Sequence, residues 1–88
     1  MLPKIQIFQM INLMKRPLII ITAPKGILAC KYMDVKTAND TDDTLCTFSN
    51  VNNYKEILNS PVVECSNKAQ HLGIYKGMKG YYALLKLI

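Results

Sequence analysis

Two apolar runs on either side of a short turn constrain the fold of this chain most. Residues 18–23 read LIIITA, residues 27–33 read ILACKYM, and Pro24-Lys25-Gly26 separates them. The first run is rich in β-branched residues, as is typical of a central strand. Two strand-like runs joined by a turn that contains proline and glycine predict a β-hairpin over residues 18–33.

Further strands are expected on both sides of this hairpin. Apolar residues share one parity near the N-terminus, which indicates a half-buried strand; they are Ile5, Ile7, Ile11 and Leu13. After the hairpin, side chains of alternating character predict a strand over residues 44–51, and residues 61–65 read as a short strand. The hairpin therefore belongs to a larger sheet.

Polar residues in capping positions predict short helices after the hairpin. Asp34 is expected to begin one helical turn that continues into an exposed loop. Asn53, with a glutamate three residues later, nearly forms a capping box before the helix YKEILN. Ser66 is expected to cap the helix NKAQHL, and Gly73 to end it in left-handed geometry. Leucine and isoleucine at helical spacing predict a last helix over residues 82–88.

The order of these elements predicts the fold class. Several strands followed by short helices, without regular βαβ alternation, indicate an α+β fold. We expect an antiparallel or mixed β-sheet of N-terminal strands, packed with two or three short helices in the C-terminal half. The length of 88 residues allows a single domain over residues 1–88. A chain of this size buries only about 60–65% of its unfolded surface, so a homodimer is expected.

Charge is distributed unevenly along the chain, which carries a net charge of +5. Residues 1–33 carry five basic groups and no acid, residues 34–64 carry all six acids with two lysines, and residues 65–88 carry four lysines and no acid. Such a chain can fold into a surface with a positive side, which favours a small anionic ligand. The alternative is a solvated lysine face, where lysine usually lies.

The residue inventory excludes several common kinds of site. Three cysteines without a CxxC pair, and a single His71 six residues after Cys65, form no zinc or redox motif. We therefore expect no metal site and no cofactor. No apolar run approaches the roughly 20 residues of a membrane span, so no membrane partner is expected. Free thiols and the lack of a signal-peptide pattern indicate a cytoplasmic protein.

The segment Gly77-Met78-Lys79-Gly80 is the main candidate for binding an anion. A GXXG loop between two helices is how KH domains clamp a nucleic-acid backbone, but the aromatic residues that stack on bases are few here. Backbone N–H groups at a helix start bind small anions, and Gly80 is expected to precede a helix with free amides. A tight turn with positive φ explains the same glycines without a ligand.

The one candidate for a reactive group is Cys30. It lies within a predicted strand beside Lys31, a cation that would activate the thiol if the two side chains met. Adjacent strand residues point to opposite faces, so we expect no such contact. A buried, inert thiol is the simpler interpretation. A cysteine-centred site would need Asp34 or His71 near it in space.

Two long segments carry a family resemblance. Residues 17–35 and 50–87 match the family pattern in order and spacing, at Gly26, Cys30, Tyr32, Asp34, Val51, Leu72, Gly73, Ile74, Gly77, Met78, Gly80, Ala83 and Leu84. On these residues the chain resembles the YunC-like family, small bacterial and archaeal proteins catalogued as a domain of unknown function. The resemblance implies a compact α+β fold and no established activity. Lys31 replaces the usual glycine, and Ser49-Asn50 replaces the usual arginine–glycine, so a family pocket that relies on that arginine would bind differently here.

Three functional hypotheses follow. The first is a non-catalytic binding or interaction protein, expected as a homodimer, whose candidate ligand-binding residues are Asp34, Gly77, Lys79 and Gly80. The alternative is a ligand-binding or catalytic site centred on Cys30, and the second alternative is nucleic-acid binding through the GXXG loop. Classical catalytic sets are missing, because one histidine and scattered serines form no recognisable triad.

Overall fold

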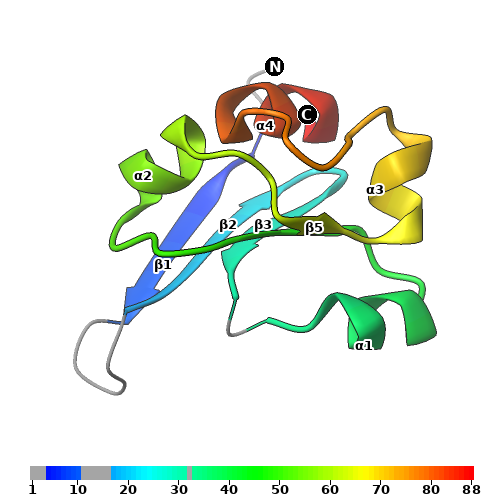
Figure 1. Cartoon of the computed structure of the whole chain (residues 1–88), viewed down its shortest axis with the longest axis horizontal. Coiled ribbons are helices and arrows are strands. Elements are labelled where there is room, and N and C mark those ends of the chain that lie inside the picture. Colours follow the sequence, from blue (N-terminus) through cyan, green and yellow to red (C-terminus); the bar gives the residue numbers. More distant parts are fainter. Residues whose placement is uncertain (1–3, 11–16, 32) are drawn as a thin grey trace.

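The computed structural model describes residues 4–10, 17–31 and 33–88, without the side chain of Met10. Nine elements follow one another along these residues (Figure 1): β1 (Gln6–Met10), β2 (Leu18–Ala23), β3 (Gly26–Cys30), α1 (Val35–Asp40), β4 (Leu45–Phe48), α2 (Tyr54–Asn59), β5 (Glu64–Cys65), α3 (Asn67–His71) and α4 (Gly80–Leu87). None of these helices has the length and apolar character needed to cross a bilayer.

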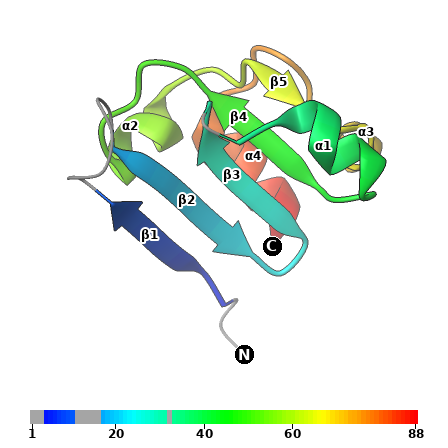
Figure 2. The same cartoon turned by 90° about the horizontal axis from the view of Figure 1, so that it is seen from below.

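A five-stranded mixed sheet forms the centre of the fold. The strands lie in chain order, β1-β2-β3-β4-β5, and neighbours are antiparallel except for β3 and β4, which are parallel. A parallel pair needs a crossover connection, and α1 lies in that connection. α2, α3 and α4 cover one face of the sheet, and α1 lies on the other face (Figures 1 and 2). The expected α+β class is confirmed, with three short helices in the C-terminal half.

The predicted hairpin is confirmed, although its second strand is shorter than expected. β2 and β3 pair antiparallel down to Ala23 and Gly26, on either side of the turn at Pro24 and Lys25. β3 ends at Cys30, because the chain turns there and the N–H of Met33 donates to the Cys30 carbonyl at 3.1 Å. That turn directs the chain into α1.

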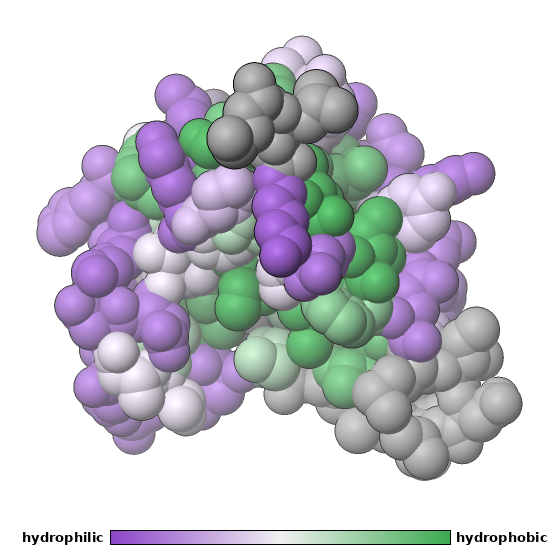
Figure 3. Space-filling view, turned by 180° about the vertical axis from the view of Figure 1, so that it is seen from behind, coloured by the Kyte–Doolittle hydropathy of each residue, from purple (hydrophilic) through white to green (hydrophobic). Residues whose placement is uncertain are grey.

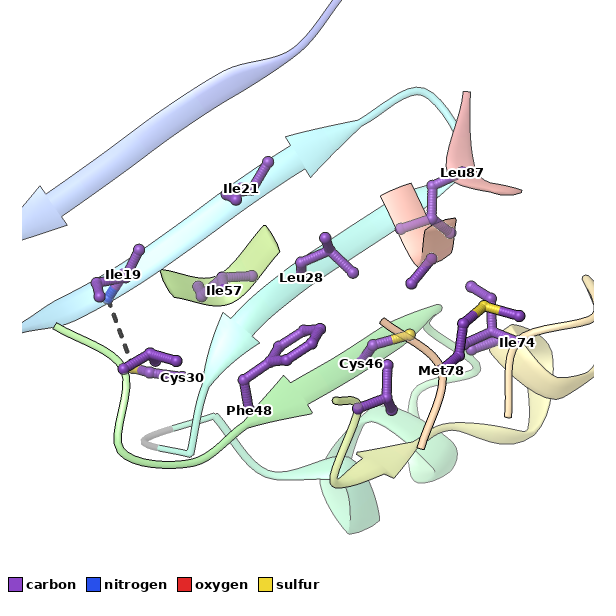
Figure 4. Packing of buried hydrophobic residues seen from close by; sticks show 14 residues of the cluster. Ile19, Ile21, Leu28, Cys30, Cys46, Phe48, Ile57, Ile74, Met78 and Leu87 are labelled. Atoms are coloured by element: carbon purple, nitrogen blue, oxygen red, sulfur yellow. Dashed lines mark hydrogen bonds between the residues drawn. The ribbon is translucent and has the colours of Figure 1, made fainter. Parts of the chain in front are cut away.

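The main hydrophobic core fills the space between the sheet and the three C-terminal helices (Figure 4). Its largest fully buried side chains come from three strands and two helices, and include Phe48, Ile19, Ile21, Leu28, Ile57 and Leu87. Burying one such side chain contributes roughly 1.5–3 kcal/mol to stability. A smaller cluster of Ala29, Val35, Ala38 and Leu45 lies on the other face, beneath α1.

These two clusters correct the expectation for β4. The strand is present, but it is shorter than residues 44–51, and all four of its residues are buried rather than every second one. Leu45 packs beneath α1, whereas Cys46 and Phe48 lie in the main core. Because helices cover both faces, side-chain alternation does not translate into alternate exposure.

The expectation of a half-buried first strand is wrong. β1 exists, but every described side chain on it is exposed, including Ile7 at 44% and Phe8 at 51%. Ile7 lies opposite the buried Ile21 in the sheet, so it points toward the helix-covered face. α2 and α4 do not extend far enough over the sheet to cover it. Ile11 and Leu13 lie outside the described residues.

The helix starts agree with the capping predictions. Asp34 accepts the N–H of Lys36 at 2.9 Å, Asn53 accepts that of Glu56 at 3.0 Å, and Ser66 accepts that of Ala69 at 3.4 Å. After α3 the chain reverses at Gly73, whose φ of +91° is the left-handed geometry expected there.

Candidate functional site

A cavity of about 330 Å³ opens beside the candidate cysteine. It lies where β3 ends and where the connection from β4 to α2 begins. Its lining residues are Pro17, Cys30, Lys31, Phe48, Ser49, Asn50 and Val51.

The parallel pairing of β3 and β4 creates this site. Cys30 and Phe48 are paired in the register, and each is the last residue of its strand. Because the strands are parallel, the residues that follow them leave the sheet at the same edge. Lys31 and Ser49 therefore meet there although 18 positions separate them in the sequence. In open sheets with helical crossovers, this carboxyl edge of parallel strands is the usual place of a ligand site.

The chain bends at the cavity through a residue with positive φ. Asn50 has a φ of +56°, the left-handed region that favours glycine. Asparagine is among the few other residues that adopt this geometry readily. Asn50 therefore forms a turn in which glycine is the more usual residue. The next residue, Val51, is buried and anchors the connection in the core.

Cys30 is nearly enclosed, as the simpler interpretation of this residue expected. It is 5% exposed and belongs to the main core. Its Sγ lies 3.5 Å from the N–H of Ile19, which donates to it (Figure 4). The same side chain also lines the cavity, so burial and access to the cavity coincide at this position.

Lys31 supplies the cation at the mouth of the cavity. Its Nζ lies 3.7 Å from Oε1 of Glu64, and both side chains are about half exposed. Surface ion pairs of this kind contribute only about 0–1 kcal/mol. A ligand carboxylate in the cavity can therefore compete for the ammonium group at little cost.

Asp34 lies in a different environment. Its carboxylate accepts the hydroxyl of Thr37 at 2.9 Å and the N–H of Lys36 at 2.9 Å, and these hydrogen bonds lower the pKa of the carboxyl below its ordinary value. The residue caps α1 and lines a separate cavity of about 290 Å³ with Thr37 and Asp43. Two of its acceptor positions are thus occupied within the helix.

In the glycine loop, residues 77–80, most backbone N–H groups donate to carbonyl groups of the fold. Gly77 donates its N–H to the Val62 carbonyl at 2.8 Å, and Gly80 donates its own to Ser60 at 2.8 Å. The N–H of Met78 donates to the carbonyl of Tyr75. The expectation of a free amide at Gly80 is therefore wrong, because the strand-like bridge between residues 61 and 79 aligns these partners.

Each glycine of the loop meets a different structural need. Gly77 has a φ of +97°, with open space where a Cβ would lie. Gly80 is the first residue of α4, so this helix begins two residues earlier than expected. A Cβ on Gly80 would collide with the carbonyl of Ile57 in α2. Lys79 stays exposed between them.

The structure distributes the predicted site residues over three regions. Cys30 lines the β3–β4 cavity, Asp34 caps α1, and Gly77 and Gly80 organise the loop before α4. Neither Asp34 nor His71 is among the residues that line the cavity at Cys30. Of the polar residues that do line it, Lys31 was considered from the sequence as the cation next to Cys30, whereas Ser49 and Asn50 were named only as departures from the family pattern. One indication in the sequence that β3 and β4 are parallel was the helical turn predicted after Asp34, which lies in the connection between them.

The other two thiols lie opposite each other. Cys46 and Cys65 are partners in the register of β4 and β5. Burial raises the pKa of the Cys46 thiol to about 12, with a smaller contribution from the charge of Cys65. Burial also raises the pKa of Cys65. Among the described residues, no three histidine, cysteine or carboxylate side chains come together as a metal site.

Comparisons with known proteins identify the family but no activity. No match is found among curated proteins. The chain is similar to a crystal structure of a protein of unknown function from Thermoplasma acidophilum, with a TM-score of 0.84 and 28% sequence identity, over 98% of this chain and 95% of the other. Residues 29–87 match the family model described as a domain of unknown function, DUF1805. That match includes the end of β3, the whole of β4 and the loop at residues 77–80, and the chain therefore belongs to the DUF1805 family.

Proposed function

We propose that the protein is a non-catalytic, cytoplasmic binding domain that holds a small organic anion in the β3–β4 cavity and works as a homodimer. One observation carries the ligand proposal: the polar residues Lys31, Ser49 and Asn50 line the same cavity as the apolar residues Phe48 and Val51. The three free thiols support a reducing compartment.

The size and lining of the cavity define the ligand class. About 330 Å³ is near the lower end of ligand sites, so the ligand is small. The ammonium group of Lys31 suits a carboxylate, and the Ser49 hydroxyl and Asn50 amide are hydrogen-bond donors. Phe48 and Val51 suit a short hydrocarbon body.

Binding is favoured over catalysis by what surrounds the thiol. The described residues that line the cavity include no carboxylate and no imidazole. A cysteine nucleophile needs a base or a charge partner to form its thiolate. The one charged neighbour in the lining, Lys31, is paired with Glu64.

The test is an NMR titration with hexanoate, compared with hexanol as a neutral molecule of the same length. We expect hexanoate to shift the amide signals of Lys31, Ser49 and Val51, and hexanol to shift them much less. Lys31→Gln should weaken hexanoate binding severalfold. Lys36→Gln, which removes an exposed lysine of α1, is the matched control and should leave binding unchanged.

Three results would contradict the ligand proposal. They are the absence of shifts around the cavity at millimolar hexanoate, equal shifts with hexanol, and equal weakening by the two lysine variants. The last result would mean that the overall positive charge, rather than the cavity, attracts the anion.

A cysteine-centred site at Cys30 is the second candidate, because the thiol lines the cavity. Its test is alkylation by iodoacetamide near neutral pH, followed by mass spectrometry of each cysteine. Fast labelling of Cys30 in the native protein, at a rate above that of free cysteine, would support this candidate. Labelling of Cys30 only on unfolding would remove it.

The homodimer is supported by the small core of an 88-residue chain and by the exposed apolar side chains of β1. Light scattering coupled to gel filtration tests it. We expect twice the chain mass of 10.0 kDa at micromolar concentration. A monomer over the whole accessible range would contradict this part of the proposal.

A further inference from the structure

The outer edge of β1 has no pairing strand among the described residues. β1 bonds to β2 on one side and forms the end of the sheet on the other. Its five residues make a free edge about 17 Å long. The opposite edge of the sheet, β5, has only two residues. An unpaired edge of this length presents backbone N–H and C=O groups that another strand can bond.

Exposed apolar side chains project from both faces of this edge. We call Ile5, Ile7 and Phe8 the β1 strip. Ile7 lies opposite Ile21, so it continues the core face beyond the helices. Phe8 lies opposite Ile20 and belongs to the other face, which no helix covers near β1 (Figure 2). Seen from behind, hydrophobic side chains gather on this part of the molecule (Figure 3).

The usual protections of an edge strand are missing from β1. Residues 6–10 contain no proline and no charged residue. The polar Gln9 is turned back toward α2, where its Oε1 accepts the N–H of Tyr54 at 2.8 Å. Its side chain therefore does not block the approach of another strand.

We propose that β1 pairs antiparallel with β1 of a second copy of this chain, around a two-fold axis near Phe8, so that the sheet continues through the dimer. This inference rests on the homodimer of the proposed function and assigns its interface.

Charge favours a second copy as the occupant. A two-fold axis places two copies of the same strand side by side, so a net charge on β1 would oppose the pairing. β1 is uncharged, although the whole chain carries +5. Phe8 is the middle residue of the strand, so its ring lies near the axis and packs against its copy. Such pairing places each side chain of the β1 strip beside side chains of the partner strand on the same face, which buries part of its apolar surface.

The experiment measures the mass of the wild type and three variants by light scattering coupled to gel filtration. Ile7→Lys and Phe8→Lys each place a charge at the edge, one on each face of the sheet. Tyr75→Lys is the matched control, because Tyr75 is 61% exposed and lies away from β1. Far-UV circular dichroism checks that each variant is folded.

We expect a dimeric wild type and Tyr75→Lys, and at least a tenfold weaker dimer in both β1 variants. Isotope-filtered NMR of the wild type should show contacts between β1 protons of different copies, and this readout holds even where a variant does not fold. A monomeric wild type overturns the homodimer together with this interface. A wild-type dimer that survives both β1 variants, or lacks the β1 contacts, overturns the interface alone. The hexanoate titration, repeated on a monomeric variant, tests the cavity separately.

Discussion

Replacing Gly80 with alanine tests the packing of α4 against α2. The added Cβ would collide with the backbone carbonyl of Ile57, which cannot rotate away as a side chain can. Overpacking of this kind costs about 1–3 kcal/mol. Movement of α4 would also weaken the hydrogen bond from the Gly80 N–H to Ser60, which contributes about 0.5–1.5 kcal/mol. Alanine regains up to about 1 kcal/mol through its higher helix propensity.

The net expectation is a loss of about 2–3 kcal/mol in the free energy of unfolding. For a domain of this size that corresponds to a fall in Tm of roughly 10–20 °C. Urea denaturation followed by circular dichroism measures it, as a lower midpoint at an unchanged slope.

Gly77→Ala is the control, because it changes the same loop without a collision. Space is open at Gly77, but its φ of +97° strains an alanine by roughly 1 kcal/mol. The loss at Gly80 should therefore exceed the loss at Gly77. A Gly80→Ala protein as stable as the wild type, or more stable, would refute the close packing, since helix propensity alone would then decide the sign.

Three further predictions concern side chains that the fold holds in place. Ser66→Ala should lower the free energy of unfolding by about 2 kcal/mol, because the buried N–H of Leu45 then loses its acceptor at 2.9 Å, and a change below about 0.5 kcal/mol in urea denaturation would refute this. Asp34 should titrate by NMR with a pKa below its ordinary value of 3.8, since the Thr37 hydroxyl and a backbone N–H bond its charged form. Because the pKa of Asp34 is depressed in the folded protein, its ionised carboxylate stabilises the fold above pH 3.8, and this stabilisation is lost as the pH falls through the folded pKa. Asp34→Asn still caps the helix and should abolish that part of the pH dependence of stability. Cys46, whose buried thiol has its pKa raised to about 12, should react with iodoacetamide at neutral pH only after unfolding, and labelling of the native protein at the rate of free cysteine would contradict its burial.

Local chemistry was enough to predict much of the secondary structure. The hairpin follows from a β-branched run and an apolar run around Pro24 and Lys25, although the Lys25 N–H also donates to the distant Leu87 carbonyl at 2.7 Å. The helix starts at Asp34, Asn53 and Ser66 follow from side chains that reach an N–H two or three residues away. Interactions of such short range depend on residues that are close in the sequence, so they can be predicted from it. The order of the predicted elements then indicated the α+β class.

The candidate site was predictable only in part. Cys30 was named from the sequence with Lys31 beside it in the chain, whereas Ser49 and Asn50 were not recognised as its neighbours. Their meeting depends on the parallel pairing of β3 and β4, which joins segments on either side of α1. Local periodicity carries no information on which strand pairs with which, or in which direction.

The sequence by itself determined where this chain forms strands, turns and helix caps, because those depend on groups a few bonds apart. Only the tertiary structure decided that both faces of β4 are covered, that β1 is left exposed, and that Gly80 lies against the Ile57 carbonyl. The physical reason is that a periodic apolar pattern shows which side chains are stable only when buried. Which element covers them depends on packing between distant parts of the chain.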